Sequence, residues 1–484
     1  MHFATLPHAR AAEAPDAPSL RDDSLELSNA DLRARVDAAA VALHRAGVGP
    51  GGVIAVALPN RVELIVALFA AWRLGAAVTP INPVLGEKEA AYQVADAGAV
   101  LVVSDDDRDL GVPRLPVAAL AAVSGEDTPS ATLSASDTAL LIYTSGTTGS
   151  PKGVMLTHAN LDAMTDSFAQ WFELGADDHS LLVLPLFHAN GIVLGTLTPL
   201  RAGGQVSITG RFSRDRFFAD VERLRPTYFS AVPAIYALLS SLPEDVRPDT
   251  SSLRFAVCGA APMPAESIER FERRFDVTIV EGYGLSETTC ASTINPLHGV
   301  RKPGTVGLPL PGQAVAVVGE DGAALPSGEV GEVVISGPVV MAGYLGRPEE
   351  TERTIVDGWL RTGDLGRFDA DGYLQIVDRI KDMIIRGGEN IYPKEIENAL
   401  YAHDDVSEAA VVGAPDPVLG EIPVAFVALR PGATATGDTL GVHVRGILSA
   451  FKCPVRITLL DELPKNPVGK IDKPALRRSL PVAS

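Results

Sequence analysis

The chain has 484 residues, of which 46% are hydrophobic and 21% charged, and its formal net charge is −19 at pH 7. The length exceeds one ordinary hydrophobic core, so we expect two or three domains. The acidic balance argues against a nucleic-acid partner or an anionic membrane surface, because both attract basic proteins, and three cysteines without CxxC or metal-ligand spacing indicate neither a disulfide framework nor a zinc site.

The start of the chain carries no export or membrane signal. Residues 1–7 lack a basic stretch followed by an apolar one, so we expect no signal peptide. The most apolar window, 62–78, is interrupted by Glu63 and Arg73 and is short for a membrane span, which favours a buried helix. We therefore expect a cytoplasmic protein without an integral membrane segment.

The first hundred residues alternate short apolar strands with helices. A helix over 29–46 begins at a cap on Ser28 or Asn29 and ends at Gly47. A strand over 52–58, a helix over 62–74 and a strand over 100–104 are expected to follow. This alternation is typical of a parallel, doubly wound sheet. A loop over 105–136, rich in Asp, Ala, Ser and Pro, comes next.

A polar segment then separates two apolar strands and reads Y-T-S-G-T-T-G-S-P-K-G over 143–153. Its glycines let backbone N–H groups face an anion, and its hydroxyls and lysine are donors suited to phosphate. A strand follows the lysine where a Walker A loop needs a helix, so the segment predicts a triphosphate site on another fold. A polar surface turn is the alternative. The candidate residues are Thr144, Ser145, Gly146, Thr147, Thr148, Gly149 and Lys152.

The alternation resumes after this segment. The expected strands cover 180–185, 227–232, 253–258 and 277–281, and the expected helices cover 192–200, 234–242 and 264–275. From Gly304 to Gly343, short Val- and Ile-rich stretches separated by Gly and Pro indicate an antiparallel sheet or a small barrel. Beyond Asp378 a compact α+β unit is expected, with helices over 393–401 and 439–451 and strands over 408–413, 423–429 and 455–460.

Two segments in the second half of this alternation carry polar chemistry. His188 follows the strand over 180–185, and a lone histidine in such a place is structural as often as functional. The segment E-G-Y-G-L-S-E-T-T over 281–289 follows another strand at its carboxyl end, where open α/β sheets bind ligands. There Tyr283 offers a ring for a base, Ser286 a hydroxyl for phosphate, and Glu287 an oxygen ligand for Mg²⁺. An ordinary glycine-rich turn is the alternative.

Three later features also fit a nucleotide site, but less strongly. Asp364 lies in a tight turn, where it can accept both hydroxyls of a ribose or simply form the turn. The charged stretch over 378–393 fits a plain linker or a hinge between two docking poses. Lys470 lies on a loop near the end of the chain, where most lysines are only solvated.

Together these segments resemble the core motifs of the adenylate-forming superfamily, which comprises acyl-CoA synthetases, peptide-synthetase adenylation domains and beetle luciferases. The motifs stand in family order from 141 to 472. The resemblance implies an α/β fold with a large N-terminal domain over 1–378, built of doubly wound subdomains and a small β-barrel-like subdomain. A hinge over 379–382 and a smaller, mobile α+β domain over 383–484 follow.

The resemblance also implies a two-step reaction. A carboxylate attacks the α-phosphate of Mg-ATP to give an acyl-adenylate and pyrophosphate, and a thiol, usually that of CoA, then displaces AMP. The implied cofactors are ATP, Mg²⁺ and CoA. A small carboxylic acid is the other substrate, and we expect a monomer or a homodimer.

Roles carry over to matching positions as follows. Residues 144–152 match the loop for the β- and γ-phosphates, and Glu287 matches the Mg²⁺ ligand. Ser286, where threonine is commoner, matches the hydroxyl that faces the α-phosphate. Lys470 matches the lysine that enters for adenylation, where a cation offsets the repulsion between carboxylate and phosphate. The adenine and ribose contacts are expected at Gly259, Ala260, Ala261, Glu281, Gly282, Tyr283, Gly284, Asp364 and Arg379.

The second half-reaction is expected to use the hinge. Lys381 matches the hinge position, and a swing about it withdraws Lys470 and brings the hairpin of Gly387 and Gly388 to a pantetheine tunnel. His188 resembles the residue that gates this tunnel. Ala189 stands where amino-acid-activating domains carry an aspartate for the α-amine, so an amino-acid substrate is disfavoured.

The acid itself is defined least. The expected acyl-site positions carry no Lys or Arg to pair a second carboxylate, which favours a medium- or long-chain fatty acid or a bulky aromatic acid over malonate- or oxalate-type diacids. Those positions are Phe187, Ala189, Ile235, Cys258, Gly282, Thr289 and Cys290. Transfer of the acyl group to a carrier-protein phosphopantetheine arm is the alternative to CoA, and a nucleotide-binding regulator without catalysis is a third hypothesis.

Overall fold

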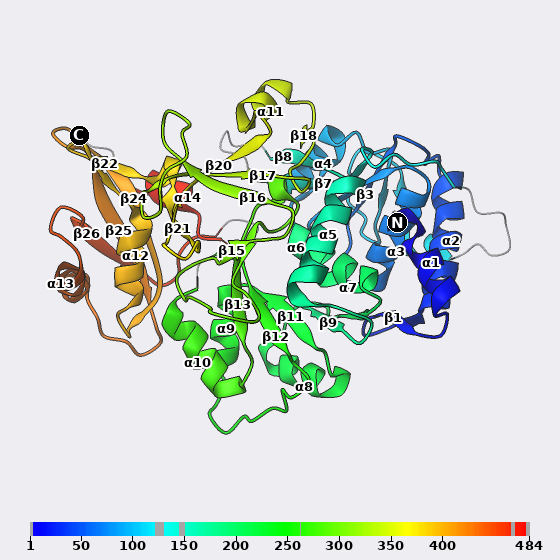
Figure 1. The fold of residues 1–484 in the computed structure, drawn as a ribbon, viewed down its shortest axis with the longest axis horizontal. Coiled ribbons are helices and arrows are strands. Elements are labelled where there is room, and N and C mark those ends of the chain that lie inside the picture. The colour runs from blue at the N-terminus through cyan, green and yellow to red at the C-terminus, as the bar shows by residue number, and fades with distance from the viewer. Residues whose placement is uncertain (1–2, 122–129, 145–150, 262, 466–469, 481–484) are drawn as a thin grey trace. The chain divides into compact units, whose positions relative to one another are not determined.

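The computed structural model describes residues 3–121, 130–144, 151–261, 263–465 and 470–480. The chain divides into two compact units (Figure 1). The first unit comprises residues 1–315 and 334–361, and the second comprises residues 316–333 and 362–484. No helix among the described residues is long and apolar enough to cross a membrane.

The larger sheet of the first unit has nine strands in the order β15-β14-β13-β12-β11-β9-β10-β1-β2. The run from β13 to β1 is parallel, and both edges end in antiparallel pairs. The strands are β1 (Pro18–Arg21), β2 (Glu26–Ser28), β9 (His179–Leu182), β10 (Gln205–Ile208), β11 (Tyr228–Ala231), β12 (Phe255–Cys258), β13 (Ile279–Tyr283), β14 (Thr293–Ile294) and β15 (Leu308–Pro309).

The second sheet of this unit has seven strands in the order β18-β8-β7-β4-β3-β5-β6. It is parallel from β7 to β6, whereas β8 and β18 are antiparallel to their neighbours. Its strands are β3 (Val53–Val56), β4 (Ala77–Pro80), β5 (Leu101–Val103), β6 (Arg114–Leu115), β7 (Thr138–Thr144), β8 (Lys152–Thr157) and β18 (Gly343–Tyr344).

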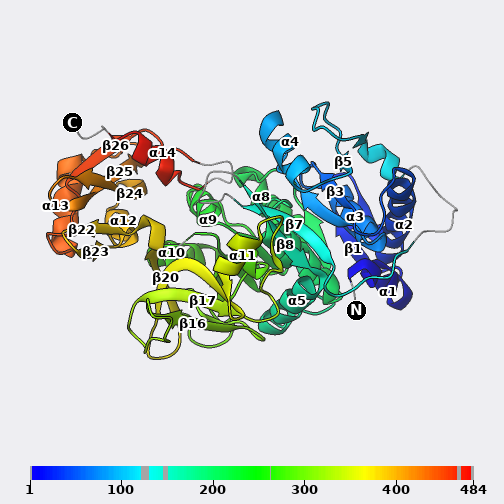
Figure 2. The ribbon, with the colours of Figure 1, turned by 90° about the horizontal axis from the view of Figure 1, so that it is seen from above.

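Helices cover both faces of each sheet, which confirms the doubly wound architecture. Because successive side chains of a strand point to opposite faces, Tyr228 joins the core between the two sheets while Phe229 joins the core beneath α8, α9 and α10. Helix α4 covers the outer face of the second sheet, beside β3 and β5 (Figure 2). The helices are α1 (Leu6–Glu13), α2 (Asn29–Arg45), α3 (Val62–Arg73), α4 (Glu87–Asp96), α5 (His158–Phe172), α6 (Ala189–Ile192), α7 (Thr198–Arg201), α8 (Arg214–Leu224), α9 (Pro233–Ser240), α10 (Ala265–Phe275) and α11 (Pro348–Thr354). There are also short 3-10 helices, η1 (Phe3–Thr5), η2 (Val117–Ala121) and η4 (Ser286–Thr288), and a π-helix, η3 (Val193–Leu197), between α6 and α7.

Local signals in the sequence are confirmed at several element ends. Ser28 caps α2, because its hydroxyl accepts the N–H of Asp31 at 3.1 Å while the Asp31 carboxylate accepts the N–H of Ser28 at 3.0 Å. The expected strand over 277–281 lies two residues later, so Gly282 and Tyr283 belong to β13 itself. Helix α5, capped by Thr157, was not expected from the sequence.

A small five-stranded sheet has the order β16-β17-β20-β19, with β21 paired to β20. Its pairs β19–β20 and β20–β21 are antiparallel. They lie beyond the stretch from Gly304 to Gly343 for which an antiparallel sheet was expected, whereas β16 and β17 lie within it. The strands are β16 (Ala314–Val318), β17 (Gly331–Ser336), β19 (Ile355–Val356), β20 (Trp359–Phe368) and β21 (Leu374–Arg379).

The end of the chain forms the expected α+β domain, whose strands run in the order β23-β22-β25-β24 with β26 beside β25. Helices α12 and α13 pack on one face of this sheet and α14 on the other. The helix expected over 439–451 ends at Ile447, because Leu448 is extended. The elements are η5 (Ile380–Asp382), β22 (Ile384–Arg386), β23 (Glu389–Ile391), α12 (Pro393–Tyr401), β24 (Val406–Asp416), β25 (Gly420–Leu429), α13 (Gly437–Ile447), β26 (Arg456–Leu460) and α14 (Lys473–Arg478).

One carboxylate joins β21 to α12. Asp378 is 5% exposed, and its two oxygens accept the N–H groups of Arg379 at 2.7 Å and Lys394 at 2.9 Å. Lys394 is the second residue of α12, where backbone N–H groups lack partners within the helix. Asp378 therefore caps α12 from the strand that precedes the expected hinge.

Candidate active site

The expected phosphate loop joins two antiparallel strands of the second sheet. Thr144 at the end of β7 lies opposite Lys152 at the start of β8, so the strands stay paired up to the loop. Thr144 is half-buried. The other loop candidates, Ser145, Gly146, Thr147, Thr148 and Gly149, lie outside the described residues.

Lys152 is buried at the base of this loop, with 6% of its surface exposed. Its ammonium group forms an ion pair with Glu350 of α11 and lies 5.2 Å from the ring centroid of Tyr344. Burial, followed by the charge of nearby Arg347, lowers the pKa of Lys152. The lysine expected to meet the phosphates is thus already paired with a carboxylate.

Tyr344 connects this lysine with the expected metal ligand. Its hydroxyl donates to Oε1 of Glu287 at 2.9 Å, while β18, which contains it, pairs with β8. The backbone carbonyl of Glu287 also accepts the N–H of Met341 at 2.9 Å. Burial, followed by the charge of Glu287, raises the pKa of Tyr344, so its hydroxyl remains a donor. Sequence reasoning missed Tyr344, because nothing local marks a contact with a residue so far along the chain.

The carboxylate of Glu287 fits a Mg²⁺ ion held together with phosphate oxygens. It is half-buried on η4, and the Tyr344 contact fixes one of its oxygens. Mg²⁺ in nucleotide sites is typically bound by one or two carboxylates plus phosphates, with no protein cage. Within the described ranges no cluster of three or more His, Cys, Asp or Glu side chains forms such a cage. Glu287 would hold the ion, and the bound ion would neutralise phosphate charge.

The carboxyl ends of β12 and β13 bring the expected adenine residues together. Cys258 and Glu281 are paired across these parallel strands, and Gly259 follows directly. Glu281 is 6% exposed and accepts the N–H of Met263 at 3.1 Å, which ties the end of the 259–263 loop to β13. Ala260 has φ +69°, a conformation that costs a non-glycine residue energy and that recurs at ligand sites. Tyr283 is half-buried and Ala261 is exposed.

The glycines beside Tyr283 have a packing role that the sequence analysis did not foresee. A Cβ at Gly284 would lie 2.3 Å from Cα of Ala291, and one at Gly282 would lie 2.8 Å from Cγ1 of Ile294. Both contacts are with the chain that returns as β14. These glycines are therefore needed for close approach of the protein's own backbone, whatever a ligand requires.

His188 follows the loop that leaves β9. It is half-buried, and its ring lies 4.5 Å from that of Phe187. Asn60 holds this loop, because its side chain donates to the carbonyl of Leu184 at 2.9 Å and accepts the N–H of Leu186 at 2.9 Å. Sequence reasoning missed Asn60, which lies in a distant part of the chain.

The second unit brings the two expected ribose residues together. Asp364 lies within β20 and not in the expected tight turn, because it is paired with Arg379 on β21. Nε of Arg379 is 2.7 Å from Oδ1 of Asp364. The Asp364 side chain is 8% exposed and that of Arg379 is 46% exposed, so the carboxylate is held in place by a partly solvated cation. Asp364 N–H also donates to the Thr362 hydroxyl at 3.0 Å.

The residues expected to form the hinge and to act in the second half-reaction lie in the second unit. Lys381 is exposed on η5. Gly387 and Gly388 have φ +60° and +88°, and they form the tight turn between β22 and β23 that two successive positive φ angles allow. Lys470 is exposed.

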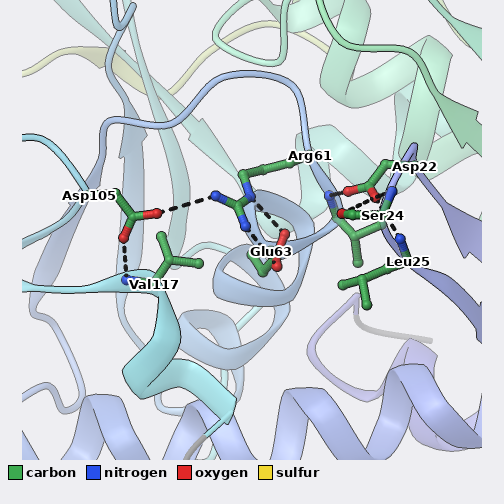
Figure 3. Close-up of polar contacts among 8 residues, drawn as sticks. Asp22, Ser24, Leu25, Arg61, Glu63, Asp105 and Val117 are labelled. Atoms are coloured by element: carbon green, nitrogen blue, oxygen red, sulfur yellow. Dashed lines mark hydrogen bonds and ion pairs between the residues drawn. The ribbon is translucent and has the colours of Figure 1, made fainter.

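A separate cavity of ≈ 310 Å³ in the first unit contains none of the expected site residues. Arg61 lines this cavity. Figure 3 shows it between two carboxylates, and Nε is 2.8 Å from Glu63 while Nη1 is 3.3 Å from Asp105. Asp105 also accepts the N–H of Val117 at 3.0 Å. The cation is neutralised by the protein itself, so this network supports the loops around α3 and η2.

The doubly wound sheets, the paired strands that flank the expected phosphate loop and the half-buried carboxylate of Glu287 are the features expected of a nucleotide-binding enzyme of the α/β class. Two family profiles match the chain: that of the AMP-binding enzyme over residues 8–345 and that of the AMP-binding enzyme C-terminal domain over residues 395–470. The chain belongs to the AMP-binding enzyme family, which confirms the resemblance to the adenylate-forming superfamily.

Relatives agree over nearly the whole length. The chain is 38% identical to a feruloyl-CoA synthase of Amycolatopsis sp, covering 98% of both chains, and 32% identical to a long-chain-fatty-acid–CoA ligase of Bacillus subtilis, covering 97% of this chain and 92% of that one. ATP-bound MatB of Rhodopseudomonas palustris has a TM-score of 0.93 at 32% identity, with 99% of each chain covered.

A second solved structure bears on the cofactors. The o-succinylbenzoate CoA synthetase of Bacillus subtilis, in complex with ATP and magnesium ion, has a TM-score of 0.90 at 30% identity, covering 98% of this chain and 99% of that one. The protein is an AMP-forming acid–CoA ligase that uses ATP, Mg²⁺ and CoA.

Proposed function

We propose that the acid is a bulky apolar monocarboxylate, with aromatic acids and medium- or long-chain fatty acids as its two forms. The observation that carries this proposal is the neutral, largely apolar character of the expected acyl positions. Ala189, Ile235 and Cys258 are buried, at 6%, 8% and 1% exposure. Burial raises the pKa of the Cys258 thiol and raises that of Cys290 to about 12, so both thiols stay neutral.

Relatives support both forms and also name the competing class. Curated relatives include an indoleacetate–CoA ligase of Aromatoleum aromaticum at 36% identity besides the feruloyl-CoA synthase. They also include a sulfoacetate–CoA ligase of Cupriavidus necator at 38% and an oxalate–CoA ligase of Arabidopsis thaliana at 34%, whose acids carry a second anionic group. A second anion needs a cationic partner when it is buried, and none of the seven expected acyl positions supplies one.

The proposed division of labour follows the two units. Lys152 and the loop before it bind the β- and γ-phosphates, Glu287 holds the metal, and Asp364 with Arg379 binds the ribose. Lys470 offsets the negative charge that builds up when the acid's carboxylate attacks the α-phosphate. The small domain over 383–484 then turns about Lys381, so that the hairpin of Gly387 and Gly388 replaces Lys470 for thioester formation.

A panel of acids tests the substrate proposal. Ferulate, indoleacetate, decanoate, palmitate, oxalate and sulfoacetate would be compared by ATP–pyrophosphate exchange and by CoA-thioester formation. We expect the highest kcat/KM with an aromatic or fatty acid, since the site offers apolar contact and no second cation. A preference for oxalate or sulfoacetate would overturn the proposal. Exchange without acyl-CoA, restored by a carrier protein bearing phosphopantetheine, would favour the carrier-loading alternative.

A further inference from the structure

The helix that directly follows Lys470 is bound to the expected hinge. Helix α14 begins at Lys473, and its cap, Asp472, accepts the N–H of Ala475 at 2.9 Å. Leu476, on the inner face of α14, is 2% exposed and packs against the sheet of the α+β domain. Lys470 therefore stands three residues before the first residue of a short helix that has a fixed position in its domain.

Two ion pairs fix α14 to the hinge side of this domain. Nη2 of Arg477 is 2.8 Å from Oδ1 of Asp382, the last residue of η5, and the two side chains are 34% and 11% exposed. Nζ of Lys473 is 2.7 Å from Oε1 of Glu397 on α12, and these side chains are 19% and 14% exposed. Asp382 is the residue immediately after Lys381.

The charge of Lys473 is maintained by its surroundings. Burial acts to lower the pKa of Lys473, but the carboxylates of Glu397, Asp378 and Asp382 outweigh it, and the net shift is upward. Glu397 also accepts the N–H of Val411 at 2.8 Å, so its orientation is fixed by the sheet as well. The pair is part of a network with several partners, in which a single broken contact affects the others.

The other end of the Lys470 loop is fixed in the same domain. Lys465 is bridged to Ile471 across the loop, and its ammonium nitrogen lies 2.7 Å from Oε1 of Glu408 on β24. The N–H of Asp472 donates to the carbonyl of Pro464 at 2.7 Å. Both stems of the loop are thus anchored, one to β24 and the other, through α14, to α12 and η5.

A reacting lysine must be held to within a fraction of an ångström by groups that are themselves fixed. The stems of the Lys470 loop are anchored, so they can supply this precision. We propose that Arg477 and Lys473 are positioning residues that join Lys470 to the hinge, so that rotation about Lys381 carries Lys470 as one rigid body with Asp382. This inference rests on the role proposed above for Lys470.

Separate assays of the two half-reactions test it. Arg477→Gln and Lys473→Met should lower kcat of ATP–pyrophosphate exchange about 10- to 100-fold, because a small displacement of a reacting group costs that much. Their KM for ATP, and thioester formation from supplied acyl-adenylate and CoA, should stay close to wild type. Arg478→Gln is the matched control, because Arg478 is the exposed neighbour on the same helix. The melting temperature of each variant shows whether the fold survives.

A double-mutant cycle and a chemical readout complete the test. Asp382→Asn should resemble Arg477→Gln, and the double variant should lose no more than either single one if the two act through each other. Arg477→Lys should restore part of the exchange rate. The rate at which an amine reagent labels Lys470, followed by mass spectrometry, should change in Arg477→Gln and not in Arg478→Gln.

The outcomes separate the inference from the function on which it rests. Equal loss of both half-reactions, or additive losses in the cycle, would overturn the positioning role of Arg477 and Lys473. If Lys470→Ala left exchange intact, the proposed role of Lys470 would be wrong, and the positioning role would fall with it. If Arg477→Gln has a low melting temperature, Asp382→Asn decides between the outcomes, since that variant breaks the same ion pair by removing the carboxylate.

Discussion

Lys152 and Lys470 are both assigned to ATP, yet the protein treats them in opposite ways. Lys152 is 6% exposed, stands on a strand and is paired with Glu350, whereas Lys470 is exposed just before the stretch that leads into α14. A lysine that binds a leaving group can be built into a sheet. A lysine that is carried into the site by a domain movement must be positioned by contacts within the moving domain. In the proposed mechanism, burial and the partners of each side chain distinguish the lysine that stays in place from the one that moves.

Removal of Lys470 should have the largest effect. Lys470→Ala should lower ATP–pyrophosphate exchange about 100- to 1000-fold, as expected when a group that stabilises transition-state charge is lost. Thioester formation from supplied acyl-adenylate should persist, because the lysine is withdrawn in that step. The two half-reactions, measured separately on one preparation, check this. An equal loss of rate in both half-reactions would mean that Lys470 does not move out of the site, and the contrast with Lys152 would fail.

A substitution of Tyr344 tests how the contacts around Lys152 and Glu287 hold the metal ligand in place. Tyr344→Phe removes the hydroxyl that donates to Glu287 at 2.9 Å and leaves the ring near Lys152. The apparent Mg²⁺ affinity should fall about tenfold, the usual effect of losing a hydrogen bond to a metal ligand. Calorimetric titration of the ATP-loaded protein with Mg²⁺ measures it. Tyr228→Phe is the control, since that hydroxyl donates to the Leu194 carbonyl at 3.1 Å; similar losses in both variants would deny Tyr344 a specific role.

The smallest effect is expected at Glu350. Glu350→Gln removes the carboxylate that competes with phosphate for Lys152. ATP should then bind about two- to fivefold more tightly, because the desolvation cost of a largely buried ion pair offsets most of its Coulombic attraction and leaves a small net effect. Calorimetry without Mg²⁺ gives the dissociation constant, and Glu349→Gln, the exposed neighbour, is the control. Weaker binding would mean that Glu350 orients Lys152 for phosphate, which would reverse its assigned effect.

Sequence reasoning reached those parts of the fold whose signals are local. The paired strands around 143–153, the cap on Ser28 and the hairpin at Gly387 and Gly388 each depend on neighbours in the chain. The family motifs placed Glu287 and Asp364 before any coordinates did.

The contacts between distant segments were beyond sequence reasoning. Tyr344 meets Glu287, Asn60 meets Leu184 and Arg477 meets Asp382 only after the sheets have formed, and no spacing rule brings such residues together. Gly282 and Gly284 are a related case. In the sequence they were interpreted as glycines that let a ligand approach the backbone, but the chain that returns as β14 already requires them. The residue type therefore indicated a close approach at these positions but not that the protein's own backbone makes it.

The cap that Asp378 places on α12 bears on how the enzyme divides its time between poses. Asp378 precedes Lys381 and its partner, the N–H of Lys394, follows it. The pivot proposed at Lys381 would break this bond once per turnover. Helix caps are worth about 1 kcal/mol, equivalent to about a fivefold bias in an equilibrium. In the proposed motion the cap would favour one pose enough to give a resting state, yet so weakly that binding of a substrate would reverse the preference.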